Sequence, residues 1–252
     1  MRIAFKIAYN GQHFDGYARQ PGKTTVEGEL ISRLTTHGII HDPRENQFRS
    51  ASRTDKNVSA LGNVIAITTS TSYEEIDKHL PALSTDSLIM YGIACVHQEF
   101  YPRHAQLRIY RYYLSKKNND LSVLLSAAEL FTGTHNFKNF ARLDPGKTPI
   151  RTINNILIST YDRFYVIDFY AQTFLWNQIR RIISAIQRLS SGKTTKEQIL
   201  DALSNPTIRS DFGLAPPEPL FLKDVIYDFS FRYHPIMEKK LKTLERQILQ
   251  RL

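Results

Sequence analysis

Apolar and polar residues alternate in residues 2–9. Ile3, Phe5 and Ile7 share one side of this segment, and Lys6 lies on the other. A period of two is typical of a strand with one face in the core and one face in water. We therefore expect the chain to begin with a half-buried strand.

The rest of the first half predicts two helices and three further strands. Thr24 and Glu27 are spaced as a capping box that opens a helix to about residue 37, and Ser72 with Glu75 opens a second helix that ends near residue 83. Apolar runs predict strands at 47–52, 63–69 and 86–96. The order strand, helix, strand, strand, helix, strand is that of a ferredoxin-like unit.

The second half repeats this order. Strands are expected at 108–114, 151–160, 164–171 and 220–227, and helices at 120–131, 174–189 and 194–203. The sequence therefore predicts an α+β protein of two tandem ferredoxin-like (βαββαβ) units, residues 1–104 and 105–252. The strands are expected to form a largely antiparallel sheet, with helices packed on one side and a central cleft between the units as the natural ligand site.

The residues from 236 to the C-terminus follow an amphipathic pattern. Their apolar stripe consists of Met237, Leu241, Leu244, Ile248 and Leu252. Such a stripe predicts a helix with one buried face. The pattern leaves open whether this helix docks on its own chain or on a second subunit.

Composition narrows the class of protein. With 42% hydrophobic and 23% charged residues, the 252-residue chain is typical of soluble globular proteins. A formal net charge of +9 favours a polyanionic partner, most simply nucleic acid, although a basic surface can also serve solubility alone. The single cysteine, Cys95, lies in an apolar run, so we expect a buried thiol and a cytoplasmic protein. Neither a signal peptide nor a membrane span is expected.

The most informative short segment surrounds Asp55, which lies between Arg53 and Lys56 among small, turn-forming residues. Two neighbouring cations favour the ionised carboxylate. An ionised aspartate on such a loop suits a nucleophile or a general base. A simple turn, in which the side chain accepts backbone N–H groups, explains the same residues without any chemistry.

A second candidate is the strand that begins at residue 108. Arg108, Tyr110 and Tyr112 fall on one of its faces, and Arg111 falls on the other. Aromatic rings beside arginines on a sheet can stack bases and hold phosphates. Tyrosine is also common in strands, so an ordinary strand with solvated arginines is the alternative.

The helix expected at 174–189 contains the third candidate. Arg180 lies at the edge of its apolar stripe, where it could reach into a cleft and pair with a carboxylate. Arg181 points away from the stripe and is expected to be a solvated charge. Trp176 stands four residues before Arg180, which allows either a stacking contact with that arginine or plain packing.

The sequence contains no pattern typical of a metal or phosphate-loop site. The eight histidines lack H-x-x-x-H spacing, and neither an acidic cluster nor a glycine-rich signature is present. His135 is expected to be a structural turn residue. We therefore expect neither a metal nor a cofactor.

In their order along the chain, several motifs resemble those of the tRNA pseudouridine synthase A family. They lie at residues 9–17, 25–30, 52–60, 108–112, 151–153, 174–180 and 215–222. The resemblance runs from about residue 2 to about residue 228. Lys56, Val58 and Trp176 make it more similar to the archaeal and eukaryotic branch, while Ser52 and Asn57 stand where family members often carry glycine.

The resemblance implies isomerisation of uridine to pseudouridine in the anticodon stem-loop of tRNA, around positions 38 to 40, without a cofactor. It implies that Asp55 is catalytic, either attacking C1′ as a nucleophile or removing the 2′ proton to give a glycal. Tyr110 is then expected to stack on the flipped base, Arg180 to pair with Asp55, and Arg53 to support the flipped-out state. Weaker candidates for contacts with the RNA backbone are Arg19, Arg108 and Arg111. Family members act as homodimers.

Two other functions fit parts of the sequence. A ferredoxin-like sheet with tyrosines and arginines on one face can bind single-stranded RNA without any reaction. An α+β scaffold for protein assembly is the third alternative. The combination of Asp55, Tyr110 and Arg180 favours the enzyme, because binding alone requires no carboxylate.

Overall fold

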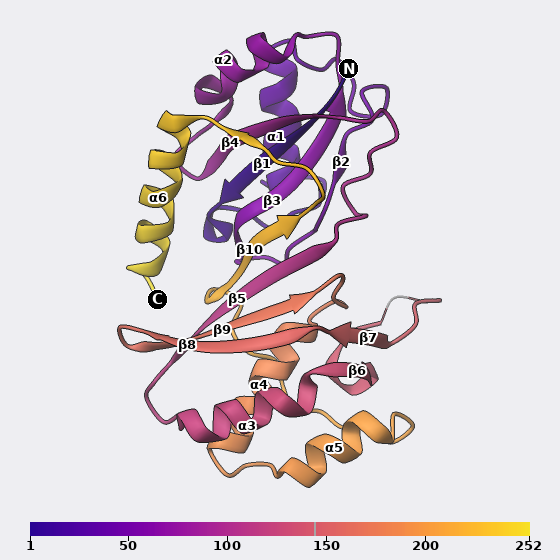
Figure 1. Ribbon diagram of the computed structural model, residues 1–252, viewed down its shortest axis with the longest axis vertical. Helices are drawn as coiled ribbons and strands as arrows, with labels where there is room; N and C mark the ends of the chain where they lie inside the picture. The colour runs from indigo at the N-terminus through magenta and orange to yellow at the C-terminus, as the bar shows by residue number, and fades with distance from the viewer. Residues whose placement is uncertain (144) are drawn as a thin grey trace. The chain divides into compact units, whose positions relative to one another are not determined.

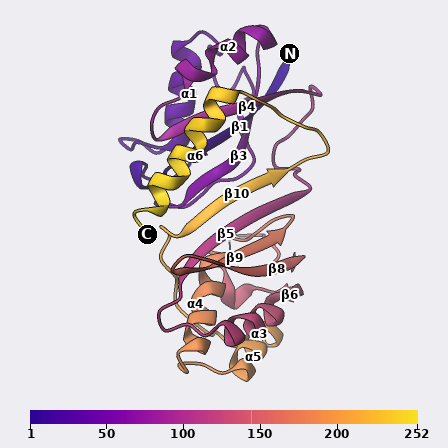
Figure 2. The same ribbon diagram turned by 60° about the vertical axis from the view of Figure 1, so that its left-hand side comes forward.

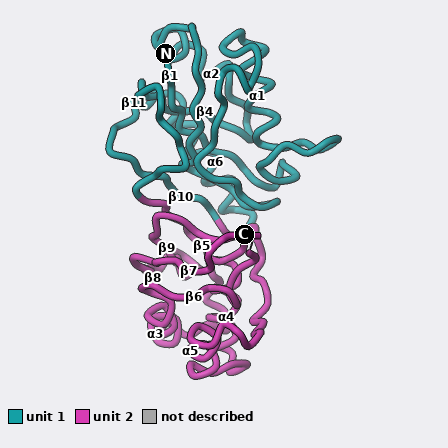
Figure 3. The backbone as a smooth tube through the Cα atoms, turned by 90° about the vertical axis from the view of Figure 1, so that its right-hand side faces the viewer, with its two compact units in different colours: residues 1–106, 221–252 teal, residues 107–220 magenta. Residues whose placement is uncertain are grey.

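The computed structural model describes residues 1–143 and 145–252 and has an α+β architecture, with largely antiparallel strands and helices on one side (Figure 1). It divides into two compact units: unit 1 is residues 1–106 with 221–252, and unit 2 is residues 107–220 (Figure 3). The first boundary lies close to the expected one. The last strand and the C-terminal helix differ from expectation, since they belong to unit 1 and not to the second unit.

The sheet of unit 1 has the strand order β11–β4–β1–β3–β10, with β2 also paired to β3. β10 runs parallel to β3, and the other neighbours are antiparallel. The strands are β1 (Arg2–Tyr9), β2 (Arg49–Ser50), β3 (Ser59–Thr68), β4 (Leu88–Val96), β10 (Leu220–Ile226) and β11 (Arg232–Tyr233). Because β3 begins at residue 59 and not at 63, the loop that carries Asp55 leads directly into it.

All eight residues of β1 are buried, so the prediction of a half-buried strand is wrong. The strand lies between β3 and β4, and its polar residues are buried with partners. Arg2 donates from Nε to the carbonyl of Phe100 (2.8 Å). Lys6 pairs with Asp224 and donates to the carbonyl of Val225 (2.8 Å). Burial lowers the pKa of Lys6, and Asp224 opposes that shift. Such partners are what allow a charged group to remain inside a protein.

The helices of unit 1 are α1 (Val26–Thr36), α2 (Tyr73–Leu83) and α6 (Pro235–Leu249), and a short 3-10 turn, η1 (Gly11–His13), follows β1. Ser72 caps α2 as predicted, since its hydroxyl accepts from the backbone N–H of Glu75. The predicted cap of α1 is wrong by one residue. Thr25 accepts from the N–H of Gly28, while the carboxylate of Glu27 accepts from a backbone N–H outside the helix.

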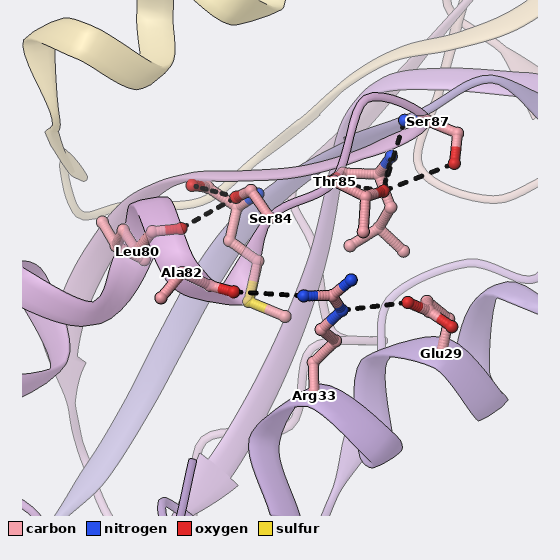
Figure 4. Close-up of polar contacts among 9 residues, drawn as sticks. Glu29, Arg33, Leu80, Ala82, Ser84, Thr85 and Ser87 are labelled. Carbon is pink, nitrogen blue, oxygen red and sulfur yellow. Dashed lines mark hydrogen bonds and ion pairs between the residues drawn. The ribbon is translucent and has the colours of Figure 1, made fainter. Parts of the chain in front are cut away.

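Side-chain contacts fix the end of α2 and tie it to α1 (Figure 4). Ser84 donates to the carbonyl of Leu80 (2.8 Å) and accepts from the N–H of Met90 in β4 (2.9 Å). Arg33 of α1 donates to the carbonyl of Ala82 (3.2 Å). Carbonyls at a helix C-terminus lack partners within the helix, and these contacts supply them.

The C-terminal helix α6 packs on β4 and α2 of its own unit (Figure 2). It buries Met237, Leu244 and Ile248 from the predicted stripe. Just before it, the ring of Tyr233 stacks on that of Tyr91 with centroids 5.7 Å apart. The helix therefore docks on the same chain.

Cys95 is exposed, so the prediction of a buried thiol is wrong. Burial ends near the C-terminal end of β4: Ala94 is buried, Cys95 is exposed and Val96 is half-buried. The apolar run of the sequence simply continues past the covered part of the strand.

Unit 2 contains a sheet with the order β5–β9–β8, formed by β5 (Leu107–Ser115), β9 (Phe164–Ala171) and β8 (Asn155–Tyr161). A second, two-stranded sheet pairs β6 (Gly133–Asn136) with β7 (Ile150–Ile153) and is absent from the sequence prediction. The helices are α3 (Leu121–Phe131), α4 (Gln178–Ser190) and α5 (Lys196–Ser204), with a 3-10 turn η2 (Lys138–Phe140).

His135 lies on β6 and not in a turn, with Nε2 2.9 Å from the carbonyl of Thr132. Among the helices of residues 1–143 and 145–252, none is long and apolar enough to cross a membrane.

Candidate active site

Asp55 lies on the loop of residues 51–58 that joins β2 to β3, and its side chain is half-buried. The backbone forms a turn there, since the N–H of Val58 donates to the carbonyl of Asp55 (3.2 Å). Asn57 has φ 67°, in the left-handed region that asparagine tolerates better than most residues. A backbone turn, closed through the carbonyl of Asp55, thus holds the chain beside the candidate carboxylate.

Buried side chains of β1 and β3 hold this loop in place. The hydroxyl of Thr54, which is buried, lies 2.9 Å from the phenol oxygen of Tyr9. Asn63 of β3 donates to the carbonyl of Ser52 (2.9 Å). Because these contacts lie on both sides of residue 53, the backbone that leads to Asp55 is fixed from within the core.

Gly11 and Tyr17, which follow β1 in the chain, also restrict the position of this loop. A Cβ added to Gly11 would lie 2.3 Å from the carbonyl oxygen of Val58, so only glycine fits there. The N–H of Tyr17 donates to the carbonyl of Thr54 (3.3 Å), and its hydroxyl donates to Ser50 (2.7 Å). Burial raises the pKa of Tyr17 well above its usual value, so the phenol stays neutral.

The two cations beside Asp55 differ in their surroundings. The ammonium of Lys56 lies 2.7 Å from the carboxylate of Asp15, and this hydrogen bond lowers the pKa of Asp15. Lys56 therefore pairs with the carboxylate of Asp15, a partner that the sequence pattern did not indicate. Arg53 is exposed.

On unit 2, Tyr110 of β5 is half-buried and its ring meets the edge of Phe174, with centroids 5.3 Å apart and planes at 84°. Tyr112 shares the strand face but is buried and donates its hydroxyl to the carbonyl of Pro216 (3.2 Å). Burial also raises the pKa of Tyr112. Of these two tyrosines, Tyr110 is the one with surface left for a ligand.

The three arginines expected to contact the RNA backbone differ in their partners and in their exposure to solvent. Arg111 forms a two-pronged ion pair with Asp168, Nε to Oδ1 at 2.8 Å and Nη2 to Oδ2 at 2.7 Å, and this raises its pKa. Arg108 is buried and donates to the carbonyl of Gln172. Arg19 in unit 1 is the more exposed side chain, although it lies 4.0 Å from the carboxylate of Glu27.

Helix α4 begins at Gln178, four residues later than expected, because Asn177 has φ 63° and ends the irregular segment before it. Arg180 lies in the first turn, where Nε donates to the carbonyl of Ala215 (2.8 Å). Arg181 was expected to be solvated, but it pairs with Asp211 (3.1 Å). A different arginine stacks on Trp176.

Trp176 instead contacts Arg142, whose guanidinium carbon lies 4.1 Å from the ring centroid. The backbone N–H of Arg142 also donates to the carbonyl of Trp176 (2.8 Å). Sequence reasoning missed this contact because no local pattern links two residues so far apart in the chain. Gly11 was also missed, although it lies inside the motif at residues 9–17.

The structure therefore places Asp55, Arg53 and Arg19 in unit 1, and Tyr110, Arg180, Arg108 and Arg111 in unit 2. Asp55, Arg53 and Arg19 lie on loops, Tyr110, Arg108 and Arg111 lie on β5, and Arg180 lies on α4; of these, Arg108 is buried. Among the residues that the structure describes, no group of three or more histidine, cysteine, aspartate or glutamate side chains could hold a metal ion.

Comparison with known proteins covers the whole chain. A family model described as tRNA pseudouridine synthase matches residues 127–228, which include Arg180. The tRNA pseudouridine synthase A of Pyrococcus abyssi is 39% identical, with 100% of this chain and 93% of the relative aligned. The proteins of the same name from Thermococcus sibiricus (40% identical; 98% and 93% aligned) and Methanocorpusculum labreanum (38% identical; 95% and 84% aligned) are also similar.

Proposed function

Because the chain belongs to the tRNA pseudouridine synthase A family and isomerises uridine in tRNA, we propose that Asp55 is the catalytic residue and that the targets are uridines of the anticodon stem-loop, around positions 38 to 40. The observation that carries the proposal is the fixed loop of unit 1. A half-buried carboxylate stands on a turn that Tyr9, Asn63 and Gly11 hold from the core. Fixed geometry is what a reaction at one sugar carbon requires.

The reaction needs one carboxylate near the ribose. The N-glycosidic bond breaks, the uracil turns, and C5 bonds to C1′ and then loses its proton, while N1 gains one. Asp55 can attack C1′ and form an ester while uracil leaves as an anion. It can equally remove the 2′ proton, so that uracil leaves with formation of a glycal.

These two routes differ in one bond. Only the glycal route breaks the bond between C2′ and its hydrogen. Uridine deuterated at C2′ therefore gives a primary kinetic isotope effect if that step limits the rate, whereas nucleophilic attack gives only a small secondary effect. The measurement needs pre-steady-state conversion, so that product release does not hide the step.

We assign Tyr110, Arg180 and Arg53 to the same reaction. The target base must leave its stack, and the half-buried ring of Tyr110 offers a face to receive it. Arg180 is proposed to pair with Asp55 and keep it ionised, and Arg53 to hold the flipped-out state. Support comes from the position of Arg180 on the first turn of α4 and from the exposure of Arg53.

We also propose that both units derive from a ferredoxin-like unit. Unit 1 supports this with its element order and with the strand order β4–β1–β3–β2. A cytoplasmic homodimer that binds one tRNA across both subunits completes the proposal. Analytical ultracentrifugation of the free protein and of its tRNA complex tests that state.

Release of tritium from C5-labelled uridine in tRNA tests the role of Asp55. We expect Asp55→Asn to bind tRNA but to release label at least about 100-fold more slowly than wild type. Asp15→Asn is the matched control, because it removes a neighbouring carboxylate that contacts Lys56, and it should keep most of the activity. Comparable rates for Asp55→Asn and wild type would exclude Asp55 as the catalytic residue.

The target site is tested separately. Transcripts of one tRNA, each with a single uridine of the anticodon stem-loop changed to cytidine, are incubated with the wild-type protein and sequenced for pseudouridine. We expect the modification to disappear with the uridines near positions 38 to 40. Modification confined to another arm of the tRNA would contradict the proposed target and leave the family assignment intact.

A further inference from the structure

Trp176 and Arg142 form an exposed pair that the proposed reaction does not use. The Trp176 side chain is 43% exposed, although tryptophan is among the most strongly buried residue types on average. Arg142 is exposed too, and its guanidinium covers the indole at 4.1 Å. The backbone hydrogen bond between the two residues (2.8 Å) fixes their relative position. The pair is thus a preformed surface of aromatic and cationic character.

The surroundings of this pair favour a negatively charged ligand. Trp176 stands two residues before α4, whose first turn contains Arg180 and Arg181 and no acidic residue. The N-terminus of a helix is itself positive, so two cations there are unfavourable unless negative charge lies nearby. Asp211 supplies negative charge to Arg181. A bound phosphate would add negative charge at the same helix N-terminus.

Polar atoms beside Trp176 also point to a ligand. In the described part of the chain, the Oδ1 atom of Asn177 and the Nε2 atom of Gln178 are buried without a hydrogen-bond partner. A buried polar group without a partner is costly, and such groups in native structures call for an explanation. A nucleotide held at Trp176 could supply both an acceptor and a donor.

The pair also lies close to the residue proposed to receive the target base. Phe174 contacts the ring of Tyr110, and only one residue separates Phe174 from Trp176. Two residue steps of extended chain span at most about 7 Å. A nucleotide on Trp176 is therefore a near neighbour of a base at Tyr110.

We propose that the Arg142–Trp176 pair is a stacking platform for an unpaired nucleotide that flanks the target uridine in the tRNA. The base stacks on the pair, and the guanidinium lies beside its phosphate. The statement that this nucleotide flanks the target uridine rests on the proposed role of Tyr110. The platform itself requires only that tRNA is the substrate.

Intrinsic fluorescence tests the platform directly, because Trp176 is the single tryptophan of the chain. We expect unmodified tRNA to quench the tryptophan emission of the wild-type protein with the same dissociation constant as a filter-binding assay gives. Emission that stays unchanged while tRNA binds would overturn the proposal. No variant is needed for this measurement, so misfolding cannot confuse it.

Variants then test the contribution to affinity. We expect Trp176→Ala to weaken tRNA binding roughly 5- to 150-fold, the range for loss of one stacked base, and Trp176→Phe to recover most of it. Arg142→Ala should weaken binding and reduce the depth of quenching. Arg163→Ala is the matched control, since Arg163 also forms a cation–π contact in unit 2, with Phe164 at 5.2 Å. It should change affinity by no more than about twofold, the effect of one remote charge.

Label release at saturating tRNA separates this inference from the proposed function. If Trp176→Ala releases tritium at saturation but needs more tRNA to do so, the platform is supported. If Trp176→Ala binds as tightly as wild type, the platform is rejected, while Asp55 keeps its assignment. If Asp55→Asn remains active, the proposed function fails, and the quenching result still stands by itself.

Discussion

The two units each present a candidate residue on an irregular segment that contains a left-handed asparagine. In unit 1 the segment 51–58 carries Asp55 and contains Asn57 with φ 67°. In unit 2 the segment 174–177 carries Trp176 and ends at Asn177 with φ 63°. In both, the asparagine lies within two residues of a regular element, β3 or α4.

The two segments differ in what holds them. Side chains from β1 and β3 and the close approach of Gly11 fix the loop of unit 1. In the segment of unit 2, the N–H of Leu175 donates to the side chain of Gln178 (2.8 Å), the N–H of Gln178 donates to the carbonyl of Leu175 (3.2 Å), and a backbone bridge joins Trp176 to Arg142. The difference agrees with the two proposed roles, since a reacting group needs fixed geometry and a binding group needs only an accessible surface.

The largest effect is expected from Gly11→Ala. The new methyl group meets the carbonyl oxygen of Val58, so either the loop or the turn η1 that contains Gly11 must shift. We expect a loss of about 3 kcal/mol in the free energy of unfolding and a larger fall in label release than in tRNA affinity. Urea denaturation measures the free energy of unfolding, and the tritium assay at varied tRNA concentration measures label release and tRNA affinity.

Gly22→Ala is the control for this substitution. Gly22 differs from Gly11 in having a left-handed backbone, φ 68°, and nothing lies within 4 Å of a Cβ added to it. We expect a cost of about 1 kcal/mol from backbone strain alone. Equal losses for the two variants would show that the contact of Gly11 with Val58 does not stabilise the loop.

The asparagines give the most direct comparison of the two segments. We expect Asn57→Ala and Asn177→Ala each to lower the free energy of unfolding by about 1 kcal/mol, because alanine is more strained than asparagine in the left-handed region. Asn57→Ala should lower the maximal rate of label release, whereas Asn177→Ala should raise the dissociation constant for tRNA. The glycine variants at both positions are the controls and should keep both parameters. If both alanine variants change the same parameter, the contrast between the segments is wrong.

A smaller effect is expected at Thr54. Thr54→Val removes a hydroxyl that lies 2.9 Å from Tyr9 in the core, and we expect a loss of about 1 kcal/mol in stability. Thr54→Ser keeps the hydroxyl and should lose less. A double-mutant cycle with Tyr9→Phe should give a coupling energy of at least about 0.5 kcal/mol. Strictly additive losses would mean that the two hydroxyls do not interact.

The smallest effect concerns alkaline pH. Burial raises the pKa of Tyr17, so the folded protein keeps the proton that the unfolded chain loses near pH 10. The stability due to this group is present below about pH 10 and is lost as the pH rises toward the folded pKa. We expect Tyr17→Phe to show a shallower fall in urea midpoint above about pH 10 than wild type. Parallel profiles would argue against a neutral, buried phenol.

The sequence predicted the helices well because their start signals are local. Ser72, Asp120 and the Thr-containing start of α5 each cap a helix with their own side chain. It failed where the outcome depends on partners distant in the chain. The sequence pattern predicts that Lys6 faces solvent. Lys6 is instead buried, and its ion pair with Asp224 on β10 compensates the cost of burying the charge.

The candidate site shows the same limit. The motif at residues 52–60 pointed to Asp55, and the motif at residues 9–17 contained Gly11. The sequence could not show that Gly11 touches Val58 or that Lys56 contacts Asp15, because both contacts join segments more than forty residues apart. Arg142 carried no signal at all, since a single arginine in a loop is typical of ordinary solvated surface.

The discontinuity of unit 1 has a consequence for how the chain is made. Synthesis runs from the N-terminus, and all of residues 107–220 are translated before β10 and α6 exist. Until then β1 holds the ammonium of Lys6 without its carboxylate, and β4 lacks the helix that covers it. The unit that begins first is therefore completed last. A ribosome that stalls after unit 2 carries a complete unit 2 and a unit 1 whose strand β3, which follows the Asp55 loop, still lacks its neighbour β10.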